Sequence, residues 1–274
     1  MDEEHALLAA VVAHPDDDTP RLVYADWLQE HDQPERAEYI RLSIQLANLR
    51  YGEPDFEARE RQLLDQRRPL IERHYRKWEG DFTVRLPTGR NATFVFRRGF
   101  VAEVHCSVKC FLDCAEWLFA SAPVRWFWPK SLSATTAQRL TASPWVGRLT
   151  GFRIIDPAHA LALVEGTPLR VKALNFSQKF LFAGQTNTRG GWADVAQRIA
   201  AGHSGLKTIE WIDLESCGIG DAGGHALAHS PGLNSVVLNL LGNGLSDPVR
   251  WALRKRYGAR VWLDPADRNG FPRG

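Results

Sequence analysis

The sequence predicts an α/β protein in which an all-helical N-terminal module precedes an array of alternating strands and helices. Two observations support this prediction. Residues 1–79 carry apolar residues at helical spacing, whereas from about residue 94 short β-rich runs alternate with helical segments. The β-rich runs also recur at a nearly constant interval, which is typical of repeat proteins. We therefore expect a helical module at 1–79 and a repeat array with a C-terminal cap at 80–274.

The N-terminal module is expected to open with two short helices. The first covers residues 3–13, where Leu7 and Val11 lie four residues apart in an apolar stripe. Residues at this spacing share one face of a helix, so the stripe predicts packing against a neighbouring helix. The second helix is expected to begin at Thr19, because Pro20 is favoured at the first helical position.

Two longer helices complete the predicted module. The third begins at Pro34 and runs through RAEYIRLSIQLANL. The fourth covers about residues 55–78 and is expected to break near Pro69, because proline lacks an N–H and clashes inside a helix. On the second helix, Asp26 is expected to pair with a nearby arginine, either Arg21 or Arg36.

The predicted array consists of strands separated by helical segments. The strands are expected at 100–106, 124–128, 149–155, 171–177, 209–215, 235–241 and 259–263. The helical segments between them are FLDCAEWLFAS, ATTAQRLTAS, AHALALVEG, WADVAQRIAAG, AGGHALAHS and PVRWALRKRYG. Successive strands begin 22 to 26 residues apart, except for one interval of 38 residues that holds an insertion at 182–191. This insertion is expected to project from the array as a long loop.

The strongest repeats fit the template L-x-x-L-x-L-x-x-[N/C]-x-L. Ile209, Ile212, Leu214, Cys217 and Ile219 fill every position of one repeat. The next repeat is filled by Leu238, Leu240, Asn243 and Leu245, with Ser235 in place of the first leucine. The segments at 149–157 and 171–181 fit with substitutions, Pro157 and Lys179 standing at the turn position. The array thus resembles degenerate leucine-rich repeats of the ribonuclease-inhibitor-like class, which implies a solenoid with parallel strands inside and helices outside.

Residues 5–46 resemble a bacterial module, the repeat-companion domain. The resemblance rests on LLAAV, on HPDDDTPRLVYADWL and on PERAEYIRLS. The later segments FRRGFVAEV and LFASAPVR are similar to the entry into the repeats in such proteins. This resemblance implies a helical module packed on a repeat array. The family carries no established activity, so it implies no catalytic residue and no cofactor.

Composition and termini limit the class of protein. The chain has 274 residues, 44% of them hydrophobic and 24% charged, with a formal net charge of +2 that selects no particular class of partner. The N-terminal sequence MDEEHALLAAVV is acidic where a signal peptide is basic, and no run approaches the roughly 18 apolar residues of a membrane span. The four cysteines fit reduced thiols. We therefore expect a cytoplasmic protein without a membrane partner.

Two groups of candidate metal ligands have simpler explanations. The groups are His14 with Asp16, Asp17 and Asp18, and Cys106 with Cys110 and Cys114. The aspartates lack the spacing of a calcium loop and suit the electropositive N-terminus of the second helix. The cysteines match no common zinc or iron–sulfur spacing and are expected to be small buried residues. We therefore expect no metal site.

Catalytic motifs are missing from the sequence. There is no Gly-x-Ser-x-Gly elbow, phosphate-binding loop or His-Glu-x-x-His pair. Cys217 lies beside Asp213 and Glu215 and suggests a nucleophile of a ubiquitin-ligase-like effector, but the repeat template buries this cysteine. The sequence therefore predicts a protein that is not an enzyme.

The candidate partner-binding residues lie between the template leucines, on the expected concave face. They are Glu103, His105, Trp126, Trp128, Arg153, Asn175, Glu210, Trp211, Asp213, Glu215 and Asn239. Tryptophan and arginine are enriched in binding hot spots, so this face is expected to bind another protein, as a scaffold or within a multi-subunit complex. A shift of one residue in VRWFW would instead bury Trp126 and Trp128, and the sequence leaves that alternative open.

A second function remains open, that of a nucleic-acid-associated accessory subunit of a bacterial complex. It would use the basic C-terminal region, namely Arg250, Arg254, Lys255, Arg256 and Arg260. Clustered basic side chains bind phosphate backbones through a salt-dependent electrostatic attraction. The two functions are distinguished by whether nucleic acid is bound at low salt.

Overall fold

The computed structural model describes residues 3–86, 91–165, 169–178, 191–202 and 206–269. The described chain is α/β, with an open eight-stranded sheet in the order β1-β2-β3-β4-β5-β6-β7-β8. It divides into two compact units, 1–126 with 268–274, and 127–267. Among the described residues, no helix combines the length and the apolar character needed to cross a membrane.

The first unit contains an N-terminal group of four helices, as the sequence predicts. Their bounds are α1 Glu3–Ala13, α2 Thr19–Glu30, α3 Pro34–Asn48 and α4 Phe56–Thr83. Successive helices contact one another, α1 with α2, α2 with α3, and α3 with α4. Val11, Ala25 and Ile40 are fully buried in the core that these helices share with Phe100. The apolar stripe of α1 therefore packs inward, as its spacing indicates.

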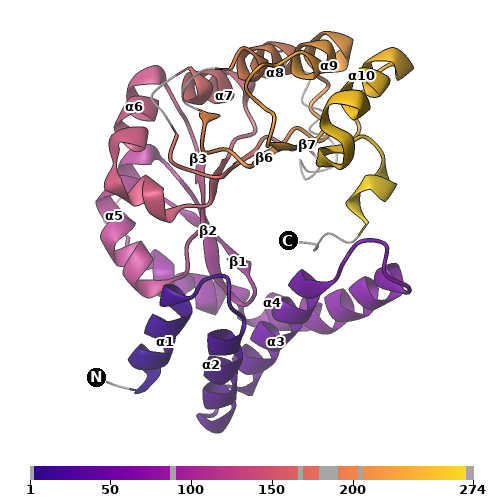
Figure 1. The fold of residues 1–274 in the computed structure, drawn as a ribbon. Coiled ribbons are helices and arrows are strands. Elements are labelled where there is room, and N and C mark those ends of the chain that lie inside the picture. The colour runs from indigo at the N-terminus through magenta and orange to yellow at the C-terminus, as the bar shows by residue number, and fades with distance from the viewer. Residues whose placement is uncertain (1–2, 87–90, 166–168, 179–190, 203–205, 270–274) are drawn as a thin grey trace. The chain divides into compact units, whose positions relative to one another are not determined.

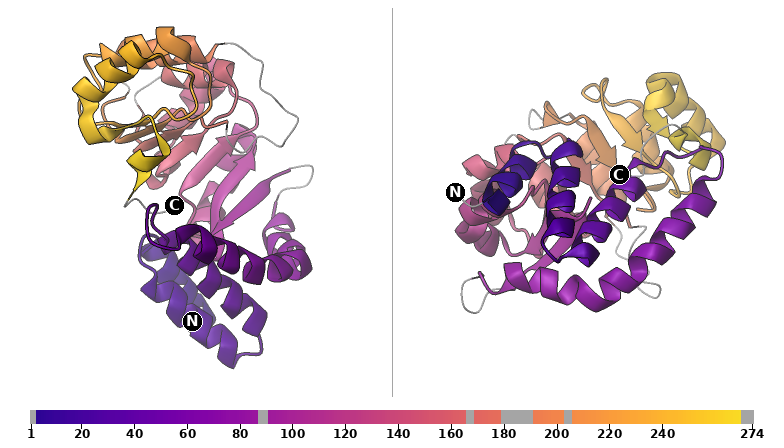
Figure 2. Two further views of the ribbon diagram at one scale, coloured as in Figure 1. Left: turned by 90° about the vertical axis from the view of Figure 1, so that its right-hand side faces the viewer. Right: turned by 90° about the horizontal axis from the view of Figure 1, so that it is seen from below.

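Helix α4 continues through Pro69, so the expected break is wrong. The helix has 28 residues, and Figure 2 shows it as one continuous ribbon. Proline removes one backbone hydrogen bond, but packing holds the helix on both sides of it. Before Pro69, Leu63 is buried in a cluster with α3, and after it Trp78 packs on the ring of Tyr39 at 4.8 Å.

The first unit also contains a β-hairpin and a helix. The hairpin consists of β1 Thr93–Arg97, which the sequence analysis did not predict, and β2 Phe100–Cys106, which it did. The two strands pair antiparallel and are joined by Arg98 and Gly99, both with positive φ, as a tight two-residue hairpin turn requires. Helix α5 Val108–Ser121 follows, with the side chain of Ser107 accepting a hydrogen bond from the Cys110 N–H at 3.2 Å.

Strands and helices alternate through the second unit. The strands are β3 Trp126–Pro129, which begins one residue before the unit, β4 Gly151–Arg153, β5 Ala173–Asn175, β6 Trp211–Asp213, β7 Val237–Asn239 and β8 Val261–Trp262. The α-helices are α6 Ala134–Ala142, α7 Pro157–Val164, α8 Trp192–Ala200, α9 Gly220–Ala228 and α10 Asp247–Tyr257. Short 3-10 helices are found at Pro144–Arg148, Gly258–Arg260 and Pro265–Arg268. The predicted insertion at 182–191 lies outside the described residues, except for Gly191.

Strands β4 to β8 pair in parallel, each with the next one along the chain. They are shorter than the sequence analysis predicts, but the parallel pairing continues past them. The N–H of Ile154 donates to the carbonyl of Asn175 at 2.8 Å, and Leu214 donates to Asn239 at 2.9 Å. Each helix from α6 to α10 likewise contacts the next, and Figure 1 shows these helices on one side of the strands.

One residue from each strand forms the centre of the core of this unit. Phe152, Leu174, Ile212, Leu238 and Val261 are paired in register and are at most 1% exposed. Side chains alternate between the two faces of a strand, so the residues on either side of this row point away from the core. The row thereby fixes which side chains are available on the other face of the sheet.

Candidate interaction surface on the strand face

The face of the second unit's strands that lies opposite the buried row carries two columns of side chains, here called the inner strand face. The first column is Gly151, Ala173, Trp211 and Val237, and the second is Arg153, Asn175, Asp213, Asn239 and Trp262. The predicted residues Arg153, Asn175, Asp213 and Asn239 therefore lie side by side on four adjacent strands. Trp262 was not predicted, because the last strand has no complete template repeat.

The alternation of burial in β3 decides the position of Trp128. Phe127 is fully buried and packs edge-on against the ring of Phe152, whereas Trp126 and Trp128 are half-buried. The alternative register, in which both tryptophans enter the core, is therefore wrong. The guanidinium of Arg153 lies 5.0 Å from the centre of the Trp128 ring, so the two form a cation–π pair on the inner strand face.

A second aromatic pair occupies the other end of this face. The rings of Trp211 and Trp262 meet edge to face with centroids 4.6 Å apart. Trp211 is half-buried and Trp262 is buried. The pair gives the face a rigid aromatic element, a feature typical of interaction hot spots.

The polar residues of the second column fix the strand ends. A side-chain oxygen accepts the backbone N–H two residues later in three successive strands: Asn175 from Ser177 at 3.0 Å, Asp213 from Glu215 at 2.9 Å and Asn239 from Leu241 at 3.3 Å. Asparagine and aspartate side chains commonly stabilise turns in this way. Part of the polar character that suggested a binding face therefore serves the fold.

Asn239 also joins the two carboxylates beside it. Its side-chain amide donates to Oδ1 of Asp213 at 2.9 Å and to Oε2 of Glu215 at 3.3 Å, and the residue is 2% exposed. Asp213 and Glu215 remain half-buried. Glu210 is exposed and pairs with Lys172 at 3.1 Å. A partner would thus meet the carboxylates and the half-buried Trp128 and Trp211 rather than the asparagine.

Three predicted site residues belong to the first unit. Glu103 is 1% exposed, with Oε2 3.7 Å from Nη2 of Arg97. His105 and Trp126 are half-buried. Within the first unit, Glu103 and His105 lie opposite Val95 and Thr93 on the hairpin. The participation of these three residues in one surface with the second unit stays a prediction.

Cys217 is enclosed and lacks the setting of a nucleophile. It is 8% exposed, and its thiol donates to the carbonyl of Phe176 at 3.2 Å. Burial raises the pKa of the Cys217 thiol, and the Asp213 carboxylate raises it further. A reactive cysteine needs an electropositive setting that lowers its pKa, so this environment opposes nucleophilic chemistry. The other three cysteines are also buried.

The aspartates before α2 form hydrogen bonds and ion pairs with other groups of the protein. Asp17 accepts the Thr19 N–H at 2.8 Å, and this hydrogen bond lowers the pKa of its carboxyl. Asp16 lies 3.3 Å from Arg125, and Asp18 lies 3.1 Å from Arg98.

Asp26, in α2, pairs with Arg41 at 2.7 Å. The expected pairing of Asp26 with Arg21 or Arg36 is therefore wrong.

Two of the five basic C-terminal residues, Arg250 and Arg254, pair with nearby carboxylates. Arg250 lies 2.6 Å from Asp264, and Arg254 contacts Asp264 at 2.7 Å and Asp267 at 3.1 Å. The hydrogen bond that the Arg254 guanidinium donates to Asp267 is the main cause that raises the pKa of Arg254. Arg256 donates to the carbonyl of Ser230 and to the side chain of Asn234. Arg260 is exposed, and Lys255 lies over the ring of Trp251, which is 65% exposed.

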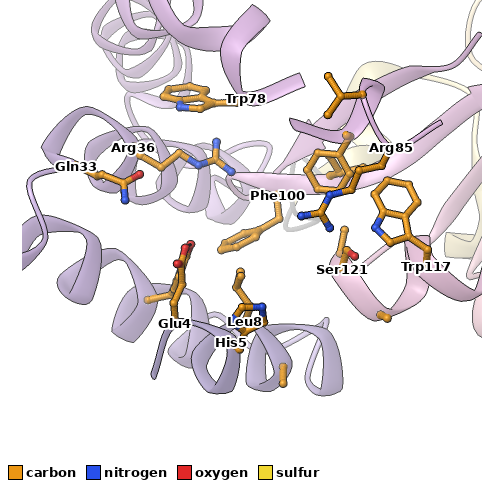
Figure 3. Close-up of a pocket in the computed structure, with 17 residues that line it drawn as sticks. Glu4, His5, Leu8, Gln33, Arg36, Trp78, Arg85, Phe100, Trp117 and Ser121 are labelled. Atoms are coloured by element: carbon orange, nitrogen blue, oxygen red, sulfur yellow. Dashed lines mark hydrogen bonds between the residues drawn. The ribbon is translucent and has the colours of Figure 1, made fainter. Parts of the chain in front are cut away.

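The first unit contains a pocket that the sequence analysis did not predict. Its volume is about 470 Å³, and residues from α1, α2, α3, α4, β2 and α5 line it. Two arginines, Arg36 and Arg85, and the aromatic residues Trp78, Phe100 and Trp117 point into it (Figure 3). These residues are far apart in the sequence and share no motif, so no local pattern indicates that they meet.

Comparisons with known proteins assign no family to this chain. No protein-family model matches the chain, and a search of curated proteins finds no similar one. The resemblance of residues 5–46 and the fit to the repeat template therefore rest on the residues of this chain alone.

Proposed function

We propose that this chain is a non-enzymatic interaction protein that binds another protein through the inner strand face. The observation that carries the proposal is the pair of aromatic elements on that face, Trp128 with Arg153 and Trp211 with Trp262. Large aromatic side chains and arginine contribute most of the binding energy in many protein interfaces. In this proposal the protein acts in the cytoplasm as a scaffold or as one subunit of a larger complex.

The same proposal includes the finer fold, a helical repeat-companion module followed by a short leucine-rich-repeat solenoid. Two residues at the turn position of the template support it. The thiol of Cys217 donates to the carbonyl of Phe176, and the amide of Asn243 donates to the carbonyl of Leu214 at 2.8 Å. In both cases the acceptor is the third template residue of the preceding repeat. A repeat solenoid requires this kind of link between neighbouring repeats.

The test compares one triple variant and one double variant in affinity purification from the native host. The strand-face variant combines Trp128→Ala, Arg153→Ala and Trp211→Ala, and the matched control combines Trp251→Ala and Lys255→Ala on the outer helix α10. We expect the strand-face variant to recover at least about tenfold less of one partner than the wild type does, because hot-spot residues each contribute roughly 2 kcal/mol. The control is expected to retain that partner.

Thermal melting of both variants must show that they remain folded. Identical partners for the wild type and the strand-face variant would refute the proposal. Loss of a partner in the α10 control alone would place binding on the helical side. A gel-shift measurement tests the alternative accessory-subunit function, since no shift of nucleic acid at low salt excludes it.

A further inference from the structure

The pocket in the first unit combines fixed cations with aromatic walls. The guanidinium of Arg36 donates to the carbonyl of Gly99 at 2.6 Å, and its carbon lies 4.7 Å from the centre of the Trp78 ring. It also lies 5.8 Å from the centre of the Phe100 ring. These contacts hold the positive charge of Arg36 at one end of the pocket. A charge held in a poorly solvated setting acts on a ligand more strongly than it would in water.

The second cation, Arg85, is less constrained. Its guanidinium lies 5.8 Å from the centre of the Trp117 ring, and Figure 3 shows it directed toward Phe100. Within the described part of the chain, the Arg85 side chain makes no hydrogen bond and no ion pair. Its planar fork of donors therefore remains available for an anionic group.

Trp117 provides a second, independent observation, a buried hydrogen-bond donor that faces the pocket. Its indole Nε1 is buried and has no hydrogen-bond acceptor among the described residues. In Figure 3 this nitrogen is on the side of the ring that faces Arg85 and the pocket. A buried donor without an acceptor costs about 1–3 kcal/mol, so an acceptor that enters beside Arg85 would remove that cost.

The remaining lining limits the charge and the shape of the ligand. Glu4 provides a single carboxylate, whose Oε1 accepts a hydrogen bond from the Tyr24 hydroxyl at 3.0 Å. Phe100, Leu8 and Phe82 supply apolar surface. Two arginines and one carboxylate leave one net positive charge among these three side chains, which a ligand with one negative charge balances and a phosphate dianion exceeds. The volume of about 470 Å³ suits a small molecule or the end of a chain.

We propose that this pocket binds a monocarboxylate that carries an apolar or aromatic group. The carboxylate pairs with Arg85 and accepts the hydrogen bond of the Trp117 indole, and the apolar group packs against Phe100 and Leu8. Either a free small acid or the C-terminal carboxylate of a polypeptide provides this chemistry. The site belongs to the first unit and does not depend on binding at the inner strand face.

The test is calorimetric titration of the full chain with 3-phenylpropionate and indole-3-propionate. The controls are 3-phenylpropanol, which lacks the charge, and phenyl phosphate, which carries a dianion. We expect the acids to bind and the alcohol to bind at least about tenfold more weakly, since charge-assisted hydrogen bonds are among the strongest polar contacts. Failure of both acids to bind at about 10 mM, or tighter binding of the alcohol or the phosphate, would overturn the proposal.

Variants locate the site. Arg85→Ala is expected to weaken binding of the acids at least about tenfold, and Trp117→Phe, which keeps the ring and removes the N–H, by a smaller factor. Arg76→Ala serves as the control, because Arg76 is an exposed residue of α4 that does not line the pocket. Equal binding by the Arg85 variant and the wild type would overturn the assignment. Melting curves establish that each variant is folded.

Two peptides identify the source of the carboxylate. One ends in phenylalanine with a free carboxylate, and the other has the same sequence with a C-terminal amide. Tighter binding of the free-acid peptide than of 3-phenylpropionate assigns the site to a polypeptide terminus. Weaker binding of both peptides than of 3-phenylpropionate assigns it to a free small acid. Equal binding of the two peptides, at an affinity at least that of 3-phenylpropionate, contradicts recognition of the carboxylate.

Discussion

Cys217 and Asn243 show how single residues at equivalent positions serve the fold. Both are buried, and both donate to the carbonyl of the residue that directly follows the preceding strand, Phe176 after β5 and Leu214 after β6. The cluster of Cys217 with Asp213 and Glu215 looks chemically reactive when the sequence is read alone. In the structure burial raises the pKa of the thiol, and the nearby carboxylates raise it further, because a negative charge disfavours a second one beside it.

The thiol of Cys217 is therefore expected to be unreactive in the folded protein. Because all four cysteines are buried, a thiol reagent such as dithionitrobenzoate should label none of them at about pH 8 without denaturant. In denaturant it should label all four cysteines of the chain. Rapid labelling of Cys217 in the native protein, identified by mass spectrometry, would contradict its burial.

Asn243 is expected to contribute to stability through the hydrogen bonds of its buried side chain. Its amide donates to the carbonyls of Leu214 and Leu240, and its oxygen accepts the Ile219 N–H. Asn243→Ala should lower the free energy of unfolding by about 2–3 kcal/mol, because buried backbone groups lose their partners. Asn243→Cys should lose less, since a thiol already performs this role at Cys217. Urea denaturation measures both variants, and equal losses would argue against the equivalence of the two positions.

The hairpin β1–β2 shows at the level of elements how the first unit is held together. Its turn approaches α3 so closely that a side chain at Gly99 would meet the Cα of Ile40 at 2.7 Å. The carbonyl of Gly99 also accepts the hydrogen bond from Arg36. A glycine is therefore required there both for its φ of +85° and for space.

We expect Gly99→Ala to lower the free energy of unfolding by at least about 2 kcal/mol, because the methyl group meets backbone atoms that cannot move aside. Gly80→Ala is the matched control, since Gly80 lies in α4 and a Cβ there meets no atom within 4 Å. The control should be neutral or stabilising by up to about 1 kcal/mol, which is the helix preference of alanine over glycine. Denaturant unfolding compares the two, and a stable Gly99 variant would show that the turn is not tightly packed.

Several acidic groups across the whole molecule have raised pKa values. Burial is the main cause for the Cys217 thiol and for the hydroxyls of Tyr24, Tyr39, Tyr75 and Tyr257. For Tyr75 the pKa rises to about 12, and its hydroxyl donates to the carbonyl of Phe94. Between the unfolded and folded pKa values, the folded chain keeps protons that the unfolded chain releases. The free energy of unfolding therefore falls as the pH rises through that range.

The chain is expected to lose stability steadily above about pH 9, where an unfolded cysteine ionises, and more steeply above about pH 10, where unfolded tyrosines ionise. Tyr75→Phe should reduce this slope, although it also removes one hydrogen bond at neutral pH. Urea denaturation at about pH 8, 9.5 and 11 measures the slope for both proteins. A free energy of unfolding that stays constant over this range would contradict the burial of these groups.

Local patterns in the sequence predict most of the elements. The alternation of apolar residues around Phe152, Leu174, Ile212 and Leu238 predicts both the strands and the columns on their other face, because only one face of each strand enters the core. The strand β1 and the continuity of α4 through Pro69 were not predicted. Both depend on packing against residues distant in the sequence, which a local pattern does not contain.

The sequence by itself determined the order of the elements and which strand residues share a face, since burial on one side imposes a fixed period on the chain. Only the tertiary structure decided which polar residues remain accessible. It buries Glu103 and Asn239 and leaves Trp128 and Arg153 half-exposed. It also brings Arg36, Arg85 and Trp117 to one pocket, although they lie on different elements. Whether such distant residues come together depends on how the helices pack. Helix packing is set by contacts between segments that no single stretch of sequence specifies.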